Sequence, residues 1–136
     1  MEKVSPLAVL AGAIIDFGTT LTFSFVIMIC FVVTHRHQRL LDATHTTPVR
    51  TLQFVLGCGC SILGAYIAGV LAKRAEILNG LLATTLPELL SWLVSLGRPS
   101  HTPRIWLVLG VIAMPVMGLF GGWLAHLQAR RSEAAA

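Results

Sequence analysis

Charged residues are scarce in this chain: they make up 12% of its 136 residues, whereas 55% of the residues are hydrophobic. The mean hydropathy is +0.79. A soluble domain of this length could not cover so much apolar surface with so few charges. The scarcity of charge therefore excludes an ordinary soluble domain and indicates that the lipid bilayer solvates much of the chain.

Cysteines and catalytic motifs are also sparse. Cys30, Cys58 and Cys60 all fall within apolar segments, which excludes a disulfide framework of the secreted type. The sequence has no glycine-rich phosphate loop, no nucleophile elbow and no His-Glu-x-x-His motif. We therefore expect no enzymatic activity and no cofactor. The net charge of +4 is scattered over both ends of the apolar segments, which favours lipid headgroups over nucleic acid as the partner.

Four apolar segments dominate the rest of the sequence. No Asp, Glu, Lys or Arg occurs at 17–34, 51–72 or 105–129, and each run is long enough, or nearly so, to cross a hydrocarbon core of about 30 Å as a helix. A fourth run, 75–97, is interrupted only by two glutamates. We predict one all-α domain over 1–136, a four-helix transmembrane bundle of up-down-up-down order. Its predicted parts are spans at about 5–34, 51–72, 75–97 and 105–128, a polar linker at 35–50 and an exposed, frayed tail at 129–136.

Both chain ends are expected on one side of the membrane, because the number of predicted spans is even. The ten Lys and Arg residues divide equally between the two sides, so the positive-inside rule does not decide the orientation. Lys73 and Arg74, in the tightest turn, favour cytoplasmic termini. The equal division also permits insertion in both orientations, with antiparallel dimers as the result.

Small residues recur at four-residue spacing in the second and fourth apolar segments. Such rows let helix backbones approach closely in lipid, where packing rather than hydrophobicity drives association. The second segment is therefore expected at the centre of the bundle or in an oligomer contact. The predicted packing residues are Gly57, Ser61, Gly64, Ala65, Ala68, Gly118 and Gly122.

The stretch at 63–86 resembles a helical hairpin of small uncharacterised bacterial inner-membrane proteins. In these proteins a Gly-Gly-Tyr-x-Ala-like segment ends one helix, a short basic turn follows, and a glycine opens the next helix. Here Ala65 takes the place of the second glycine. The resemblance implies a four-helix fold in a bacterial inner membrane and implies no activity. The matching residues are Gly64, Ala65, Tyr66, Ala68, Lys73, Arg74 and Gly80.

Asp16 and Glu88 are the candidate functional residues, because an ionisable group within the hydrocarbon costs about 3 kcal/mol or more. At about 1.5 Å per residue, Asp16 lies ~16 Å and Glu88 ~20 Å from the same membrane face. Thr20 and Thr84 lie one helical turn away from them. Two such polar stripes facing each other would form a path for protons or a small cation. In the alternative interpretation each carboxyl is merely tolerated, protonated against a threonine hydroxyl.

The third apolar segment contains a helix-start signal near its middle. Thr85, Pro87 and Glu88 form a capping-box pattern with proline at an early helical position. The pattern predicts that this helix is broken near Pro87. Broken helices at mid-membrane depth are typical of ion and substrate sites in transporters.

Three histidines of the polar linker, His35, His37 and His45, are weak candidates for a metal site. They lack the fixed helical spacing that a zinc site requires, so solvated interfacial side chains are the favoured interpretation.

Two functional hypotheses follow. The first is a small integral membrane protein of structural or accessory type, which packs as a homo-oligomer or as a subunit of a membrane complex. The alternative is a minimal proton- or cation-coupled transporter or channel for small solutes, which acts as a dimer through Asp16 and Glu88.

Overall fold

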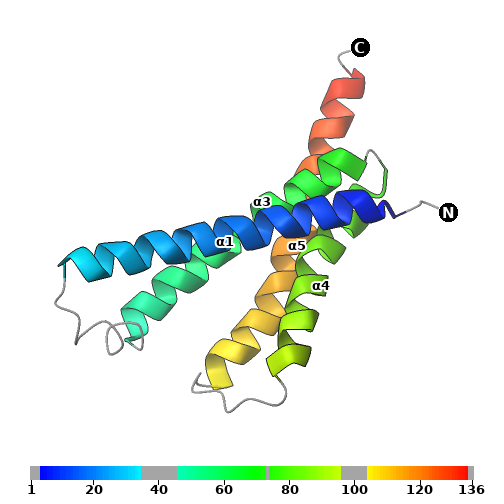
Figure 1. Ribbon diagram of the computed structural model, residues 1–136. Coiled ribbons are helices and arrows are strands. Elements are labelled where there is room, and N and C mark those ends of the chain that lie inside the picture. Colours follow the sequence, from blue (N-terminus) through cyan, green and yellow to red (C-terminus); the bar gives the residue numbers. More distant parts are fainter. Residues whose placement is uncertain (1–3, 35–45, 73, 96–103, 135–136) are drawn as a thin grey trace.

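The computed structural model describes residues 4–34, 46–72, 74–95 and 104–134 (Figure 1). This part of the chain folds into four helices and contains no strand, which confirms the predicted all-α fold. The helices are α1 (Pro6–Thr34), α3 (Thr47–Ala72), α4 (Glu76–Ser95) and α5 (Arg104–Ala134).

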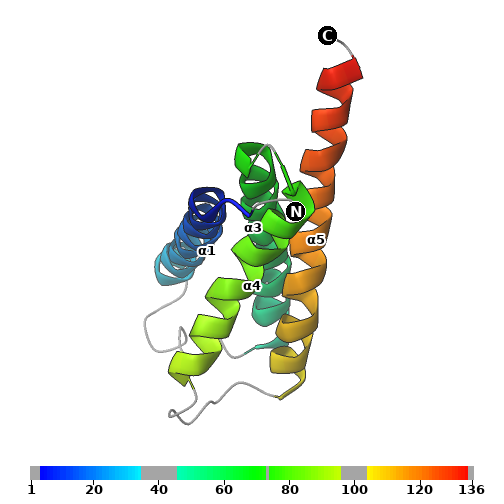
Figure 2. The same ribbon diagram turned by 90° about the vertical axis from the view of Figure 1, so that its right-hand side faces the viewer.

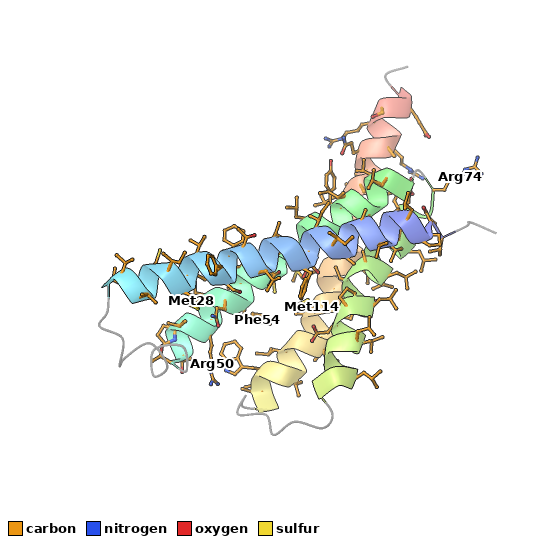
Figure 3. All side chains as sticks on the ribbon, in the orientation of Figure 1. Met28, Arg50, Phe54, Arg74 and Met114 are labelled. Atoms are coloured by element: carbon orange, nitrogen blue, oxygen red, sulfur yellow. The ribbon has the colours of Figure 1, made fainter. Side chains whose placement is uncertain are left out.

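Three helical segments within the described residues are long and apolar enough to cross a membrane: Pro6–Thr34, Thr47–Ala72 and Val108–Ala134. The distribution of side chains is also the reverse of that in a soluble protein. The largest fully buried side chains are polar, those of Asn79, Thr84 and Ser61. Large apolar side chains are exposed along all four helices (Figure 3). The structure therefore supports a helical, multi-pass membrane protein whose apolar surface faces lipid.

Successive helices run in opposite directions and converge at the end that carries the α3–α4 turn (Figures 1 and 2). α3 and α4 occupy the middle, since each packs against the other and against both α1 and α5. Away from the turn, the pair formed by α1 and α3 diverges from the pair formed by α4 and α5. Regular bundle packing along the whole helix length is therefore not confirmed.

Glycines explain where the helices converge. A Cβ on Gly12 of α1 would lie 2.6 Å from the carbonyl oxygen of Gly64 in α3. A Cβ on Gly80 of α4 would lie 2.8 Å from Cα of Gly122 in α5, and one on Gly121 would lie 2.5 Å from a carbonyl oxygen of α3. These distances are too short for any side chain, so glycine is what lets the backbones touch.

The predicted packing residues separate into two groups. Ser61, Gly64, Ala65 and Ala68 are buried in α3, and Gly118 and Gly122 are buried in α5. Gly57 does not pack closely, because a Cβ there would meet nothing within 4 Å. It lines two cavities instead, so its four-residue spacing from Ser61 did not mark a close helix contact.

The predicted break near Pro87 is wrong. α4 is one continuous helix from Glu76 to Ser95 with Pro87 inside it. Thr85, expected to cap a second half-helix, instead donates its hydroxyl to the carbonyl oxygen of Leu81 at 2.8 Å. This bond one turn back keeps the threonine within the helix. Pro87 leaves the carbonyl of Ala83 without its helical N–H, a loss that membrane helices tolerate.

Two predicted boundaries also change. α3 begins at Thr47, so the last residues of the predicted linker are helical, and Pro48 stands at an early position where its missing N–H costs no hydrogen bond. Residues 130–134 of the predicted tail are exposed as predicted, but they are helical rather than frayed, because α5 continues to Ala134. His35, His37 and His45 lie outside the described residues.

The side chain of Asn79 links the α3–α4 turn to the start of α1 through hydrogen bonds. Its side-chain oxygen accepts the N–H of Ser5 at 2.9 Å, and its amide donates to the carbonyls of Arg74 at 3.2 Å and Ala75 at 2.9 Å. Ala75 adopts a left-handed conformation, with φ of 52°. Asn79 is 0% exposed, so its side-chain amide has no access to water as an alternative partner.

Replacing Asn79 with alanine is expected to destabilise the protein by about 1–3 kcal/mol, because buried donors and acceptors lose their partner. Thermal unfolding in detergent micelles, followed by circular dichroism, measures the loss. Thr22→Val is the control, since the Thr22 hydroxyl bonds the Gly18 carbonyl on an exposed face. An Asn79→Ala variant as stable as Thr22→Val would show that the turn does not depend on this side chain.

Candidate functional site

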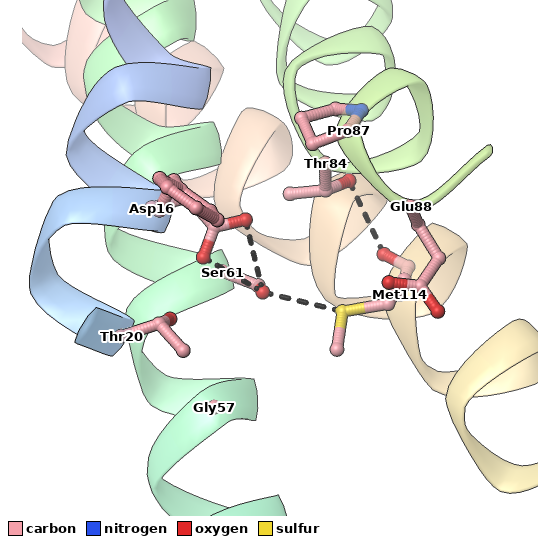
Figure 4. A pocket seen from close by; sticks show the side chains of 9 residues that line it. Asp16, Thr20, Gly57, Ser61, Thr84, Pro87, Glu88 and Met114 are labelled. Carbon is pink, nitrogen blue, oxygen red and sulfur yellow. Dashed lines mark hydrogen bonds between the residues drawn. The ribbon is translucent and has the colours of Figure 1, made fainter. Parts of the chain in front are cut away.

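A polar cavity of about 230 Å³ lies where the four helices begin to diverge, and every helix contributes to its wall (Figure 4). Phe17, Gly57, Pro87 and Met114 line it together with a polar group. That group consists of Asp16 and Thr20 from α1, Ser61 from α3, and Thr84 and Glu88 from α4.

Asp16 and Ser61 form the buried end of this polar group. Asp16 is 9% exposed and Ser61 2% exposed. The Ser61 hydroxyl lies 3.1 Å from Oδ1 and 3.2 Å from Oδ2 of Asp16, and 3.3 Å from Sδ of Met114. A serine hydroxyl donates one hydrogen bond and accepts others. When Asp16 is ionised, Ser61 donates to it. When Asp16 is protonated, it can donate to Ser61, whose own proton then turns to the sulfur. The pair therefore suits both states of the carboxyl.

Thr84 joins α4 to α5 beside the cavity. Its hydroxyl lies 3.1 Å from the carbonyl oxygen of Leu81 and 3.3 Å from that of Met114, and its side chain covers Gly118. The residue is almost completely buried. Because its single proton is shared among backbone carbonyls, Thr84 primarily holds the wall of the cavity in place.

Glu88 is the exposed end of the polar group. Its carboxyl is half-buried, and it forms no hydrogen bond or ion pair with any residue that the structure describes. Its Oε1 would lie 3.8 Å from a Cβ on Gly110 of α5. No basic side chain from the described ranges lines the cavity. Two carboxyls thus share one space, and no described residue places a fixed counter-charge in it.

The structure brings all four predicted path residues, Asp16, Thr20, Thr84 and Glu88, to one cavity. Sequence reasoning placed Ser61 among packing residues and missed its bond to Asp16. The sequence feature that could have indicated this role of Ser61 is its hydroxyl within a row of small apolar residues. Met114 gave no signal at all, since a methionine in an apolar helix is ordinary.

The parts of the chain that the structure describes hold no group of three or more His, Cys, Asp or Glu side chains placed to bind a metal ion. All their buried polar side-chain atoms have hydrogen-bond partners. Comparison of the sequence with protein-family models, and of the chain with curated proteins and solved structures, gives no match. The cavity itself is therefore the basis for a functional argument.

Proposed function

We propose that this protein moves protons or a small cation across a bacterial inner membrane through the cavity that contains Asp16 and Glu88. The observation that carries the proposal is that Asp16 and Glu88, 72 residues apart in the sequence, line the same cavity in a chain with only six acidic residues. In this proposal α4 also crosses the membrane and brings the number of spans to four, so both termini lie on one side, which we take to be the cytoplasm.

The free-energy cost of burying charge favours a site that binds and releases a proton or a cation. An ionised carboxylate within the membrane is costly unless an opposite charge or a proton neutralises it. No basic side chain lines the cavity among the described residues, so a mobile proton or cation is the available neutralising partner. The Asp16–Ser61 pair keeps a hydrogen bond in both states of Asp16, and the Glu88 carboxyl, which bonds none of the described residues, provides the second binding group.

Flux measurements in liposomes test this proposal. The purified protein is reconstituted with a pH-sensitive dye inside, and a pH gradient is imposed with the membrane potential clamped. We expect the gradient to decay faster than in protein-free liposomes, and an Asp16→Asn/Glu88→Gln double variant to return it to the protein-free rate. Decay at the protein-free rate for H⁺, Na⁺ and K⁺ gradients alike, or equal decay with the double variant, would overturn the proposal. Repeating the measurement with Na⁺ and K⁺ gradients identifies the ion.

A structural or accessory role is the second candidate, and the exposed apolar face of α1 favours it. From Phe17 onward the large apolar side chains of this helix are mostly exposed, and a Cβ on Gly18 would meet nothing within 4 Å. Such a surface suits a second copy or another membrane subunit as well as lipid. In that role the protein should purify with a partner or as a stable oligomer in mild detergent, and Asp16→Asn should leave the assembly intact.

A further inference from the structure

A second cavity of about 430 Å³ lies between α4 and α5, next to the polar one. The two cavities share Glu88 and Met114, so Glu88 stands at their junction. The remaining wall of the second cavity is Thr85, Leu89, Val111 and Pro115. Glu88 is the only charged side chain among the described residues that line it.

This arrangement has a polar end and an apolar end. Asp16 and Glu88 place two carboxyls on the polar side, whereas Leu89, Val111 and Pro115 give the other side an apolar wall. Pro115 supplies no N–H to the carbonyl of Val111, which adds a backbone acceptor to the apolar side. Together the two cavities reach the size of ligand pockets, which enclose roughly 300–1,000 Å³.

We propose that the paired cavities bind an organic ammonium ion that carries one apolar substituent, with the cationic nitrogen at Glu88 and the apolar group against Leu89 and Val111. The inference rests on the proposed function, since Glu88 serves both, and it names the substrate class of that site. Charge complementarity decides between occupants: a lipid acyl chain or an apolar helix of a second copy would leave Glu88 without a counter-charge in a low-dielectric site.

Calorimetric titration of the purified protein in detergent micelles tests the proposal with benzyltrimethylammonium as the probe. Tetramethylammonium carries the charge without the apolar group, and benzyl alcohol carries the apolar group without the charge. We expect benzyltrimethylammonium to bind at least about ten-fold more tightly than either, because the full ligand alone uses both ends of the site. Glu88→Gln should weaken its binding by a similar factor.

A cavity-filling variant separates the two ends of the site. Leu89→Trp should fill the apolar cavity. It should therefore weaken the binding of benzyltrimethylammonium and leave the affinity for tetramethylammonium unchanged. Leu90→Trp is the matched control, since Leu90 is the next residue and lines neither cavity. The inference would be overturned if the two ammonium ions bound with equal affinity, or if benzyl alcohol bound as tightly as benzyltrimethylammonium. It would also be overturned if Leu89→Trp had no effect on binding.

Failure of the ligand inference and failure of the proposed function give different results. If the parent conducts protons in a Glu88-dependent manner but binds no benzyltrimethylammonium, the ligand inference fails and the proposed function stands. If the ammonium binds but no proton or cation flux is found, the site binds its ligand and the transport proposal fails.

Discussion

Replacing Glu88 with glutamine is expected to reduce the proton flux of the reconstituted protein by on the order of ten-fold or more. Glutamine preserves the size and the polarity of the side chain but neither takes up a proton nor attracts a cation. Glu88 has no partner among the described residues, so the substitution breaks no hydrogen bond between them. Flux into dye-loaded liposomes, normalised to the amount of protein incorporated, measures the effect.

A matched control separates the cavity from general changes in charge. Glu133→Gln removes the same charge from the exposed end of α5 and should leave the flux at the parent value. Asp16→Asn should reduce the flux as Glu88→Gln does. Ser61→Ala should reduce it less, because Asp16 keeps its carboxyl but loses a hydrogen-bond donor. Equal flux in the parent and in Glu88→Gln would contradict the role of this carboxyl.

Replacing Gly121 with alanine is expected to destabilise the helix assembly by about 1–3 kcal/mol, the usual cost of overpacking a tight contact. The new Cβ would lie 2.5 Å from the carbonyl oxygen of Ile62, 2.6 Å from Cβ of Ala65 and 3.0 Å from the backbone nitrogen of Tyr66. Two of these are backbone atoms, so α3 and α5 must separate to make room. Unfolding in a detergent titration, followed by circular dichroism, gives the change in the free energy of unfolding.

Gly59→Ala is the control for this series. A Cβ on Gly59 would meet nothing within 4 Å, so only the helix propensity changes. Alanine stabilises a helix by about 0.5–1 kcal/mol relative to glycine, so this variant should be as stable as the parent or slightly more stable. If Gly121→Ala and Gly59→Ala had the same stability, close backbone contact between α3 and α5 could not be what holds the helices together.

The sequence predicted the features that depend on composition and on distance along a helix. Scarce charge and long apolar runs predicted the all-α fold. The similar depths of Asp16 and Glu88 predicted that they could meet, because depth follows from counting residues along each helix. The length of a helix past the membrane was less predictable, since the polar residues after Gln128 fit a helix as well as a frayed tail.

Features that depend on the rotation of each helix about its axis were not predictable. Four-residue spacing marked Gly57 and Gly118 equally, yet only Gly118 faces a neighbouring backbone. Gly12 was missed because its close neighbours lie on other helices, and Asn79 because its partner Ser5 is 74 residues away in the sequence. The Thr85–Glu88 pattern misled, since a threonine hydroxyl can cap a new helix or bond back within an existing one.

Water access at position 88 tests the central claim, that a polar cavity lies inside the membrane between these helices. In a background with Cys30, Cys58 and Cys60 replaced by alanine, Glu88→Cys, Leu90→Cys and Ser132→Cys variants are treated in membrane vesicles with a charged thiol reagent. We predict that the thiol at position 88 reacts, as does the one at the exposed position 132, whereas the one at position 90, on the apolar surface, does not. An unreactive thiol at position 88 beside a reactive one at position 132 would contradict the account.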